Sequence, residues 1–494
     1  MPEEFDLDLR STQEARNLVK RAAEAQKVFA RFNQYQVDAV VAAMAEAGYR
    51  AAERLGQMAS DETRFGVPIH KMIKNQFASR DVWEYIKDIK TVGVIGRDDA
   101  RRVVEIAWPF GVIAALVPVT NPTSTVIFKS LIALKARNGI VFSAHPSAAK
   151  CTAEAARIMA EAAVAAGAPA GLVGCLTLGS MAGTQELMKQ KEVKLILATG
   201  GESMVHFAYS LGKAAIGVGP GNVPIYIDRS ADLAKAARDV VNGASFDNGV
   251  ICSHEGAVVV DQPVAAQFTQ ELERNGAFFL DDTQMALLGK AMFRPDGMMM
   301  PDFVGRSVQQ LAKLVGITVP DDARVLMARL YEVGPQAPLS REKLCPVVAF
   351  YTEDGWRRGC ERCIEILHFG GLGHSMGLHC KNEDIILEFG LEKPASRIIV
   401  NSSSLPGAVG FNSGLAPSLV LGTGGMGGGI TSDNISVQHL MNVKRMAYEL
   451  HAFEPPRPPA APKPAPQAAP TPKPATDVEA IVRKVVEEVL ARKS

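Results

Sequence analysis

The chain has 494 residues, of which 47% are hydrophobic and 21% are charged, with 53 acidic residues balancing 53 Lys and Arg. This length is too great for a single core and predicts two or three domains, with the composition of a globular enzyme. Because the net charge is zero, no overall field favours nucleic acid or an anionic membrane as a partner.

The ends and the cysteines set the expected compartment. Residues 1–6 are acidic and lack the basic and apolar segments of a secretory signal, and no apolar run approaches the roughly 20 residues that span a bilayer. The seven cysteines are odd in number and irregularly spaced, which argues against a disulfide framework. We therefore expect a cytoplasmic protein with reduced thiols.

The first half of the chain predicts a parallel sheet that follows a helical start. Residues 11–58 have apolar residues at helical spacing and predict two or three helices. Residues 91–107 are rich in β-formers around a polar turn and predict a hairpin or extended arm. From 111 to 227 strands and helices alternate, which predicts a parallel sheet covered on both faces. Its expected elements are strands at 112–117, 139–142, 172–178 and 193–198, and helices at 127–137, 148–166 and 184–189.

A second α/β block is expected from about 230 to 425, with strands at 257–260, 347–351 and 398–400. The predicted division of the whole chain is into N-terminal helices and a cofactor domain at 1–229 with the arm at 91–107, a catalytic domain at 230–429, a return segment at 430–453, a linker at 454–475 and a terminal helix at 476–494.

The C-terminal segment predicts a tethered helix. The Pro/Ala-rich linker cannot form a core and is expected to be a disordered, semi-extended spacer. After it, Thr476 and Glu479 have capping-box spacing. Aliphatic residues then follow at i, i+3, i+4, i+7, i+8, i+11 and i+12, which makes one helix face wholly apolar. Such a helix is marginal alone in water, so it should bind a different protein, fold back on its own body or pair with another copy.

Cys252 is the candidate nucleophile. It follows the turn-prone segment 245–251 and precedes a strand, and Gly and Asn in that approach let backbone amides come close to whatever the sulfur attacks. The alternative is a buried cysteine that acts as a small hydrophobe.

Other motifs are weaker. Neither glycine cluster, 217–222 or 422–429, has the dinucleotide fingerprint at a first strand-to-helix turn, and no phosphate loop is present. Cys360 and Cys363 form a C-x-x-C on an expected helix without a second pair at metal spacing, and no metal site is predicted. His374 has flanking glycines that would leave its imidazole room for a ligand, although a structural histidine is an equal alternative.

Four segments together carry a family resemblance. Residues 117–124 (VPVTNPTS), 198–201 (ATGG), 246–252 (FDNGVIC) and 342–347 (EKLCPV) come in the order of the aldehyde dehydrogenase superfamily. The chain most resembles the CoA-acylating branch, including the aldehyde half of bifunctional aldehyde-alcohol dehydrogenases. The resemblance covers roughly residues 10–450. It implies two open α/β domains, one for the cofactor and one for catalysis, a β oligomerisation arm, and a homodimer or homotetramer.

The resemblance also implies roles for individual residues. Cys252 would attack the aldehyde, and Asn121 with the backbone N–H of Cys252 would form the oxyanion hole. His374 would be a candidate general base for Cys252 or for CoA. Glu342 would hold the nicotinamide ribose of NAD. The expected cofactor-binding residues are Thr120, Ser143, His145, Pro146, Thr199, Gly200, Gly201, Val218, Gly219, Glu342 and Leu344.

Two departures from hydrolytic relatives are informative. Ser143 and His145 stand where those relatives place a Lys against the adenosine ribose, so recognition there should differ, with NAD expected over NADP. Hydrolytic members also have a Glu that activates water at the start of the segment matching 217–224, whereas residues 217–227 contain no carboxylate. The thioester is then expected to wait for the thiol of CoA, which needs less activation than water.

Residues 454–494 resemble the linker and helix that direct enzymes into bacterial microcompartments. This implies a short-chain aldehyde such as acetaldehyde or propionaldehyde, shell or cargo proteins as partners, and a place within a microcompartment of the bacterial cytoplasm. The alternatives are a hydrolytic or substituted-aldehyde dehydrogenase of the same fold, acting for example on sulfoacetaldehyde or succinate semialdehyde, and a non-catalytic scaffold organised by its tail.

Overall fold

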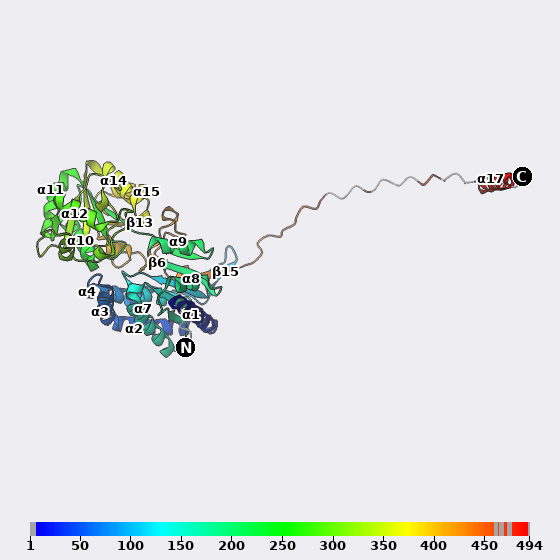
Figure 1. Cartoon of the computed structure of the whole chain (residues 1–494), viewed down its shortest axis with the longest axis horizontal. Helices are drawn as coiled ribbons and strands as arrows, with labels where there is room; N and C mark the ends of the chain where they lie inside the picture. The colour runs from blue at the N-terminus through cyan, green and yellow to red at the C-terminus, as the bar shows by residue number, and fades with distance from the viewer. Residues whose placement is uncertain (1–5, 459–462, 464–468, 472–476, 493–494) are drawn as a thin grey trace. The chain divides into compact units, whose positions relative to one another are not determined.

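The computed structural model describes residues 6–458, 463, 469–471 and 477–492. The chain divides into two units, Met1–Ala447 and Tyr448–Ser494, and Figure 1 follows it from one end to the other. The first unit holds three sheets and the second holds one helix.

Helices open the first unit, as the apolar spacing of its sequence predicts. They are α1 (Leu7–Phe29), α2 (Gln34–Arg50), α3 (Ala52–Thr63), α4 (Pro68–Gln76) and, after a π-helical turn at Phe77–Asp81, α5 (Val82–Ile86). In α2 a capping box at Asn33 fixes the first turn, and one apolar face packs inward. These helices cover the first sheet, where Phe29, Val41 and Met44 join its core.

The first sheet has five parallel strands in the order β5-β4-β3-β6-β7. The strands are β3 (Val112–Val117), β4 (Gly139–Ala144), β5 (Val173–Cys175), β6 (Val193–Thr199) and β7 (Ala215–Val218), and the helices between them are α6 (Pro122–Lys135), α7 (Ala149–Ala165), α8 (Met181–Lys189) and α9 (Glu202–Ser210). All residues of β3 and β4 are buried, as their continuous apolar runs predict. Helix α6 starts five residues earlier than expected because Pro122 suits the first turn of a helix.

The second sheet has seven parallel strands in the order β10-β11-β12-β9-β8-β13-β14. The strands are β8 (Val223–Ile227), β9 (Glu255–Asp261), β10 (Ala277–Phe279), β11 (Val325–Arg329), β12 (Val347–Glu353), β13 (Gly373–His379) and β14 (Ala395–Val400). Its helices are α10 (Leu233–Ser245), α11 (Ala265–Arg274), α12 (Asp282–Met292), α13 (Val308–Val315), α14 (Gly355–Phe369), α15 (Glu383–Glu392) and α16 (Ser404–Ala408).

The change of sheet lies earlier than the predicted boundary at 229. Strand β8 lies inside the first predicted block, 111–227, where no strand was expected at its position, and it pairs with β9 and β13 in the second sheet. The crossing from one sheet to the other is therefore the glycine-rich segment between β7 and β8. Periodicity cannot detect this change because a buried parallel strand has the same apolar pattern in either sheet.

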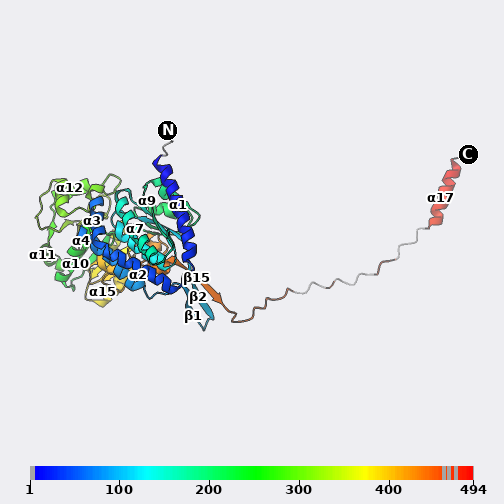
Figure 2. The ribbon, with the colours of Figure 1, turned by 90° about the horizontal axis from the view of Figure 1, so that it is seen from below.

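A third, antiparallel sheet contains the predicted hairpin, β1 (Gly93–Asp98) and β2 (Val103–Pro109). The return segment supplies its third strand, β15 (Met441–Ala447), along the full length of β2. Figure 2 shows the three strands side by side.

The second unit contains α17 (Val478–Ala491), none of whose residues is buried. Its start differs from the predicted one because Asp477 occupies the N-cap position, and Thr476 lies outside the described residues. Most of the predicted linker also lies outside them; its described residues, 454–458, 463 and 469–471, are in neither helix nor strand.

Candidate active site

A cavity of about 770 Å³ lies between the first and second sheets. Residues at or just after the ends of β3, β4, β6 and β7 line one side, and residues that precede β9, β12 and β13 line the other. Residues of α8 and of the segments 293–299 and 409–421 complete the lining. The strand order of the first sheet reverses between β3 and β6, which is where open parallel sheets bind ligands. The topology therefore makes this cavity the candidate active site.

The cavity brings together nearly all of the residues predicted from the sequence. Its lining includes both Cys252 and Asn121, together with every expected cofactor residue, namely Thr120, Ser143, His145, Pro146, Thr199, Gly200, Gly201, Val218, Gly219, Glu342 and Leu344. His374 is the one predicted site residue that does not line it.

A strained turn presents Cys252. Asp247, Asn248 and Gly249 have φ angles of 51°, 52° and 73°, so three consecutive residues adopt the left-handed conformation. Gly249 is required there, because a Cβ atom would lie 2.9 Å from the carbonyl carbon of Cys345. Backbone strain of this kind persists only where surrounding contacts impose it. The thiol then stands half-buried just before β9, at the predicted junction of loop and strand.

Burial dominates the electrostatics of the Cys252 thiol. Burial first and the nearby Glu342 carboxylate second raise its pKa to about 12, while the positive charges of Arg397 and Lys74 act in the opposite direction. In the protein alone the thiol is therefore protonated at neutral pH. A catalytic cycle has to supply the thiolate, since only that form is the nucleophile.

Asn121 lies at the N-terminus of α6, where the chain leaves β3. Its Oδ1 accepts a hydrogen bond of 2.6 Å from Lys74 Nζ, and its Nδ2 lies 3.2 Å from Thr120 Oγ1. An amide held in this way can donate an N–H to an oxygen atom in the cavity without carrying charge of its own.

On the cofactor side of the cavity, a buried lysine bonds the ends of two neighbouring strands to each other. Lys129 Nζ donates to the carbonyl oxygens of Leu116 and Leu197 and to Thr199 Oγ1, at 2.8, 3.0 and 2.9 Å. Thr199 Oγ1 in turn donates to Leu116 O. These bonds hold the ends of β3 and β6 together beside Gly201, the N-cap of α9, where backbone N–H groups favour an anion.

Glu342 approaches the nucleophile through Gly221. Its Oε1 accepts a hydrogen bond of 2.9 Å from the Gly221 N–H, and burial raises its pKa to about 7. A Cβ atom on Gly221 would lie 2.0 Å from the carbonyl oxygen of Cys252, so only glycine allows this approach. Glu342 is also the only carboxylate among the residues that line the cavity, all of which belong to the described part of the chain.

His374 is buried in β13. The Cβ of a side chain at Gly373 would meet Thr423 O at 2.1 Å, so that glycine lets two backbone segments pack. The His374 ring lies beside Gly221, since its Cδ2 would be 3.3 Å from a Cβ atom there, and its buried Nε2 has no hydrogen-bond partner among the described residues. The imidazole Nδ1 is 3.0 Å from Ser375 Oγ, and burial lowers the pKa of His374 to about 3. Its proposed role as a base stays a prediction.

Some residues of the site escape sequence reasoning. Lys71 and Lys74 of α4 are buried against Asp247, although they read as the polar residues of a surface helix. Arg341 lines the cavity with its guanidinium 4.7 Å from the ring centroid of Phe369. The lysine pair with i, i+3 spacing was the only local signal, and it does not reveal a partner about 175 residues away in the sequence.

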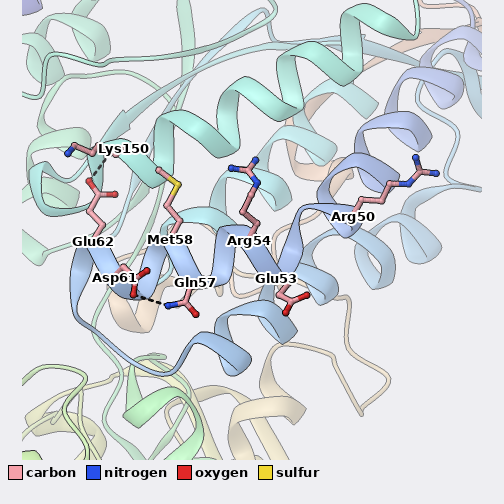
Figure 3. A pocket seen from close by; sticks show the side chains of 8 residues that line it. All are labelled: Arg50, Glu53, Arg54, Gln57, Met58, Asp61, Glu62 and Lys150. Atoms are coloured by element: carbon pink, nitrogen blue, oxygen red, sulfur yellow. Dashed lines mark hydrogen bonds between the residues drawn. The ribbon is translucent and has the colours of Figure 1, made fainter.

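A second depression, on the surface of α3 and the start of α7, holds none of the predicted residues (Figure 3). Two of its charged side chains, Arg54 and Glu62, join α3 to α7. Glu62 accepts from the backbone N–H groups of Lys150 and Cys151, which caps α7, and Arg54 pairs with Glu154 at 2.6 Å. It thus belongs to the packing of these two helices.

Comparison with known sequences gives one family and a set of relatives. The sequence model of the Aldehyde dehydrogenase family matches residues 6–277. Aldehyde-alcohol dehydrogenase 2 of Entamoeba histolytica is 40% identical over 87% of this chain and 51% of its own length. The chain thus spans about half the length of the first curated relatives it matches. The acetylating succinate-semialdehyde dehydrogenase of Clostridium kluyveri is 34% identical over 88% of this chain and 95% of its own length.

Solved structures agree with this assignment. An acetylating aldehyde dehydrogenase from Geobacillus thermoglucosidasius matches with a TM-score of 0.90 and 47% identity, over 92% of this chain and 100% of its own. The propionaldehyde dehydrogenase of a Clostridium phytofermentans fucose utilisation microcompartment has a TM-score of 0.79 and 26% identity, over 88% and 97% of the two chains. The same values describe a Rhodopseudomonas palustris propionaldehyde dehydrogenase solved with bound CoA and an acylated cysteine.

Two searches of the described residues bear on partners. None of the helices there is long and apolar enough to cross a membrane. That part of the chain also contains no group of three or more His, Cys, Asp or Glu side chains arranged to hold a metal ion.

Proposed function

The chain belongs to the aldehyde dehydrogenase family, and from this premise we propose that it oxidises a short-chain aldehyde with NAD and transfers the acyl group to CoA. The observation that carries the proposal is the shared cavity. It sets Cys252 and Asn121 beside Glu342 and the strand ends of the first sheet.

The residues fit a dinucleotide on chemical grounds. The cavity adjoins the reversal point of an open parallel sheet, with the N-terminus of α9 available for phosphate groups and Glu342 available for ribose hydroxyls. When bound there, NAD would supply the hydride acceptor. The small residues Gly200, Gly201 and Gly219 would let backbone approach it closely.

The chemistry of the chain's own groups follows from their positions. The Cys252 thiolate adds to the aldehyde carbon, and the resulting alkoxide receives hydrogen bonds from the Asn121 amide and the Cys252 N–H, a contribution of roughly 3 to 4 kcal/mol per donor. Loss of hydride from that carbon leaves a thioester on Cys252. The thiolate of CoA then displaces the Cys252 sulfur, so the net products are acyl-CoA, NADH and a proton.

Transfer to CoA rather than water is supported by the segment 217–227, which contains no carboxylate. Hydrolysis needs a base that removes a proton from water, whereas a thiol ionises readily and exchanges with a thioester at nearly equal energy. A relative that binds CoA and carries an acylated cysteine has the same fold.

A substituted aldehyde is the second candidate, favoured by Arg341. Its guanidinium lies in the cavity wall over Phe369, where it could pair with a carboxylate or sulfonate of the substrate. Relatives named for succinate semialdehyde and sulfoacetaldehyde support this reading.

One set of rates tests the reaction and the substrate together. NADH formation is followed with C2 to C5 aldehydes, succinate semialdehyde and sulfoacetaldehyde, each with and without CoA. The proposal expects steady turnover of the short unsubstituted aldehydes only with CoA, and about one turnover per site without it. Steady turnover in water alone would identify a hydrolytic enzyme, and a preference for the anionic aldehydes would identify the second candidate.

We also propose that α17 directs the enzyme into a bacterial microcompartment. Its seven Val, Ile and Leu residues from Val478 to Leu490 are each 50 to 66% exposed, which is costly unless a partner covers them. Residues 476–494 fused to a fluorescent protein should form puncta only when shell proteins are co-expressed. Diffuse fluorescence in their presence would reject targeting and leave self-association or docking onto the enzyme's own body.

A further inference from the structure

A buried charge cluster lies directly behind the nucleophile and the oxyanion amide. It consists of Lys71 and Lys74 on α4 and of Asp247 in the turn before Cys252, and their side chains are 3%, 4% and 0% exposed. Asp247 Oδ2 lies 3.1 Å from Lys71 Nζ and 2.5 Å from Lys74 Nζ. Two ammonium groups share one carboxylate, so the cluster keeps an excess positive charge. Burying such a charge is unfavourable for folding, which points to another use.

Lys74 is fixed as an ammonium by three acceptors. Its Nζ donates to Asp247 Oδ2, to Asn121 Oδ1 at 2.6 Å and to Val250 O at 3.3 Å. An ammonium has three N–H donors, and each of these acceptors takes one. Although burial lowers the pKa of Lys74 to about 8, the Asp247 carboxylate and these bonds favour the charged form at neutral pH.

This contact decides which end of the Asn121 amide is available for chemistry. Because Oδ1 accepts from Lys74, Nδ2 is the end of the amide that is left for chemistry. One of its two N–H groups is directed at Thr120 Oγ1, and the other is available. The flipped amide would set its N–H groups against an ammonium, so donor would meet donor. Lys74 thus imposes the orientation that an oxyanion donor needs.

The same lysine links the amide to the nucleophile. Asp247 and Val250 both belong to the short segment that ends at Cys252, and Lys74 binds both. The charged groups that act on the Cys252 thiol are Glu342, Arg397 and Lys74. Of these, Lys74 alone also contacts Asn121.

We propose that Lys74 is a positioning residue for the reaction proposed above. It holds the Asn121 amide with its N–H toward the reacting oxygen, and its charge favours both the Cys252 thiolate and the alkoxide that forms from it. Lys71 completes the cluster by donating to Asp247 and to Thr120 O at 3.0 Å, which steadies the chain just before Asn121.

A double-mutant cycle tests the first half of the proposal. Asn121→Ala should lower kcat by about 10²- to 10³-fold. Lys74→Met should lower kcat by roughly 10- to 100-fold with a smaller effect on the KM for aldehyde, and because part of this loss passes through Asn121, the double variant should be clearly faster than the product of the two single losses predicts. If the two losses multiply in the double variant, Lys74 does not act through Asn121 and this half is overturned.

Alkylation of Cys252 by iodoacetamide, with no aldehyde or cofactor present, tests the second half independently of turnover. Lys74→Met should move the pH profile of alkylation to higher pH, because a positive charge near the thiol is lost. An unchanged profile would overturn the electrostatic role. If the wild-type protein makes no acyl-CoA, the proposed function fails while this measurement still tests Lys74.

Lys135→Met is the matched control for the loss of a buried ammonium. Lys135 pairs with Asp38 at 2.5 Å at the opposite end of α6 from Asn121, about 20 Å along the helix. Its loss should lower the thermal midpoint but leave the alkylation profile unchanged. Should Lys74→Met fail to fold, Lys74→Gln keeps a donor without the charge and should show the same alkaline shift of the profile; a wild-type profile in that variant would equally overturn the role.

Discussion

The two sides of the cavity are built by different means. The cofactor side consists of strand ends and small residues, such as Thr199 and Gly201 at the end of β6, that lie next to one another because parallel strands end at one edge. The catalytic side depends on charged side chains brought from distant parts of the sequence, such as Lys74 and Asp247. Topology alone therefore produces a place to bind, whereas reactivity at Cys252 depends on individual long-range contacts.

This difference predicts that substitutions on the two sides of the cavity change different measured quantities. Variants of the catalytic side should change kcat or the alkylation of Cys252. Variants of the cofactor side should change the KM for NAD while the thiol reacts as before.

The largest effect is expected for Cys252→Ala. Without the sulfur no thiohemiacetal or thioester forms, so aldehyde-dependent NADH formation should fall below detection while the thermal midpoint changes little. Cys175→Ala is the matched control, since Cys175 is also half-buried but lies in β5 outside the cavity lining. Turnover that survives in Cys252→Ala would remove the nucleophile from the mechanism.

Glu342→Gln should affect both sides, because its carboxylate lies between them. Loss of the ribose contact should raise the KM for NAD by roughly tenfold, about 1.4 kcal/mol. At the Cys252 thiol the same substitution should increase reactivity rather than impair it. The Glu342 charge raises the pKa of Cys252, and Glu342 itself has a pKa of about 7.

At pH 8 to 9 the wild-type carboxylate is ionised, so the Gln variant should be alkylated several-fold faster than wild type. Near pH 5.5 the wild-type carboxyl group is mostly protonated, and the two proteins should react at similar rates. Equal rates at both pH values would show that Glu342 does not influence the thiol.

Thr199→Val should have a smaller effect, confined to the cofactor side. The substitution keeps the shape but leaves Lys129 without one acceptor and Leu116 O without one donor, at a cost of about 1 to 3 kcal/mol in stability. We expect a lower thermal midpoint and a KM for NAD raised by a few-fold. Alkylation of Cys252 should stay at the wild-type rate, and a change there would mean that the two sides are coupled.

The sequence predicts the cofactor side well for the same physical reason. Apolar runs such as 112–117 and 193–198 identify parallel strands, and the carboxyl ends of such strands meet at one edge whatever the details of packing. The family resemblance names Thr120, Ser143 and Thr199 as cofactor-binding residues, and the structure brings all three to the lining of one cavity. Strand β8 was not predicted, and its pairing with β9 in the second sheet could not be, because an apolar pattern carries no information on a strand's neighbours.

On the catalytic side, the turn-prone approach to Cys252 made it a candidate, and the family resemblance added Asn121 and Glu342. Lys74 was missed because its partners lie 47 and 173 positions away in the sequence. The role of His374 stays a prediction, because it was named from its glycine neighbours and the family resemblance, and in the structure Gly373 makes a close backbone contact with Thr423.

The smallest effect on catalysis is expected from removal of residues 448–494. They form a unit of their own, and the sheet that ends the first unit is completed by β15, which the truncation keeps. Rates with aldehyde, NAD and CoA should stay within about twofold of wild type, and a larger loss would show that the tail contributes to the active enzyme.

In the full-length chain, Val485→Glu places a charge in the middle of the apolar face of α17 and should abolish shell-dependent puncta without changing the rates with aldehyde, NAD and CoA. Arg483→Glu is the matched control, because it introduces the same side chain without replacing an apolar residue, and its puncta should persist. Puncta that persist in both variants would mean that the apolar face is not what the partner recognises.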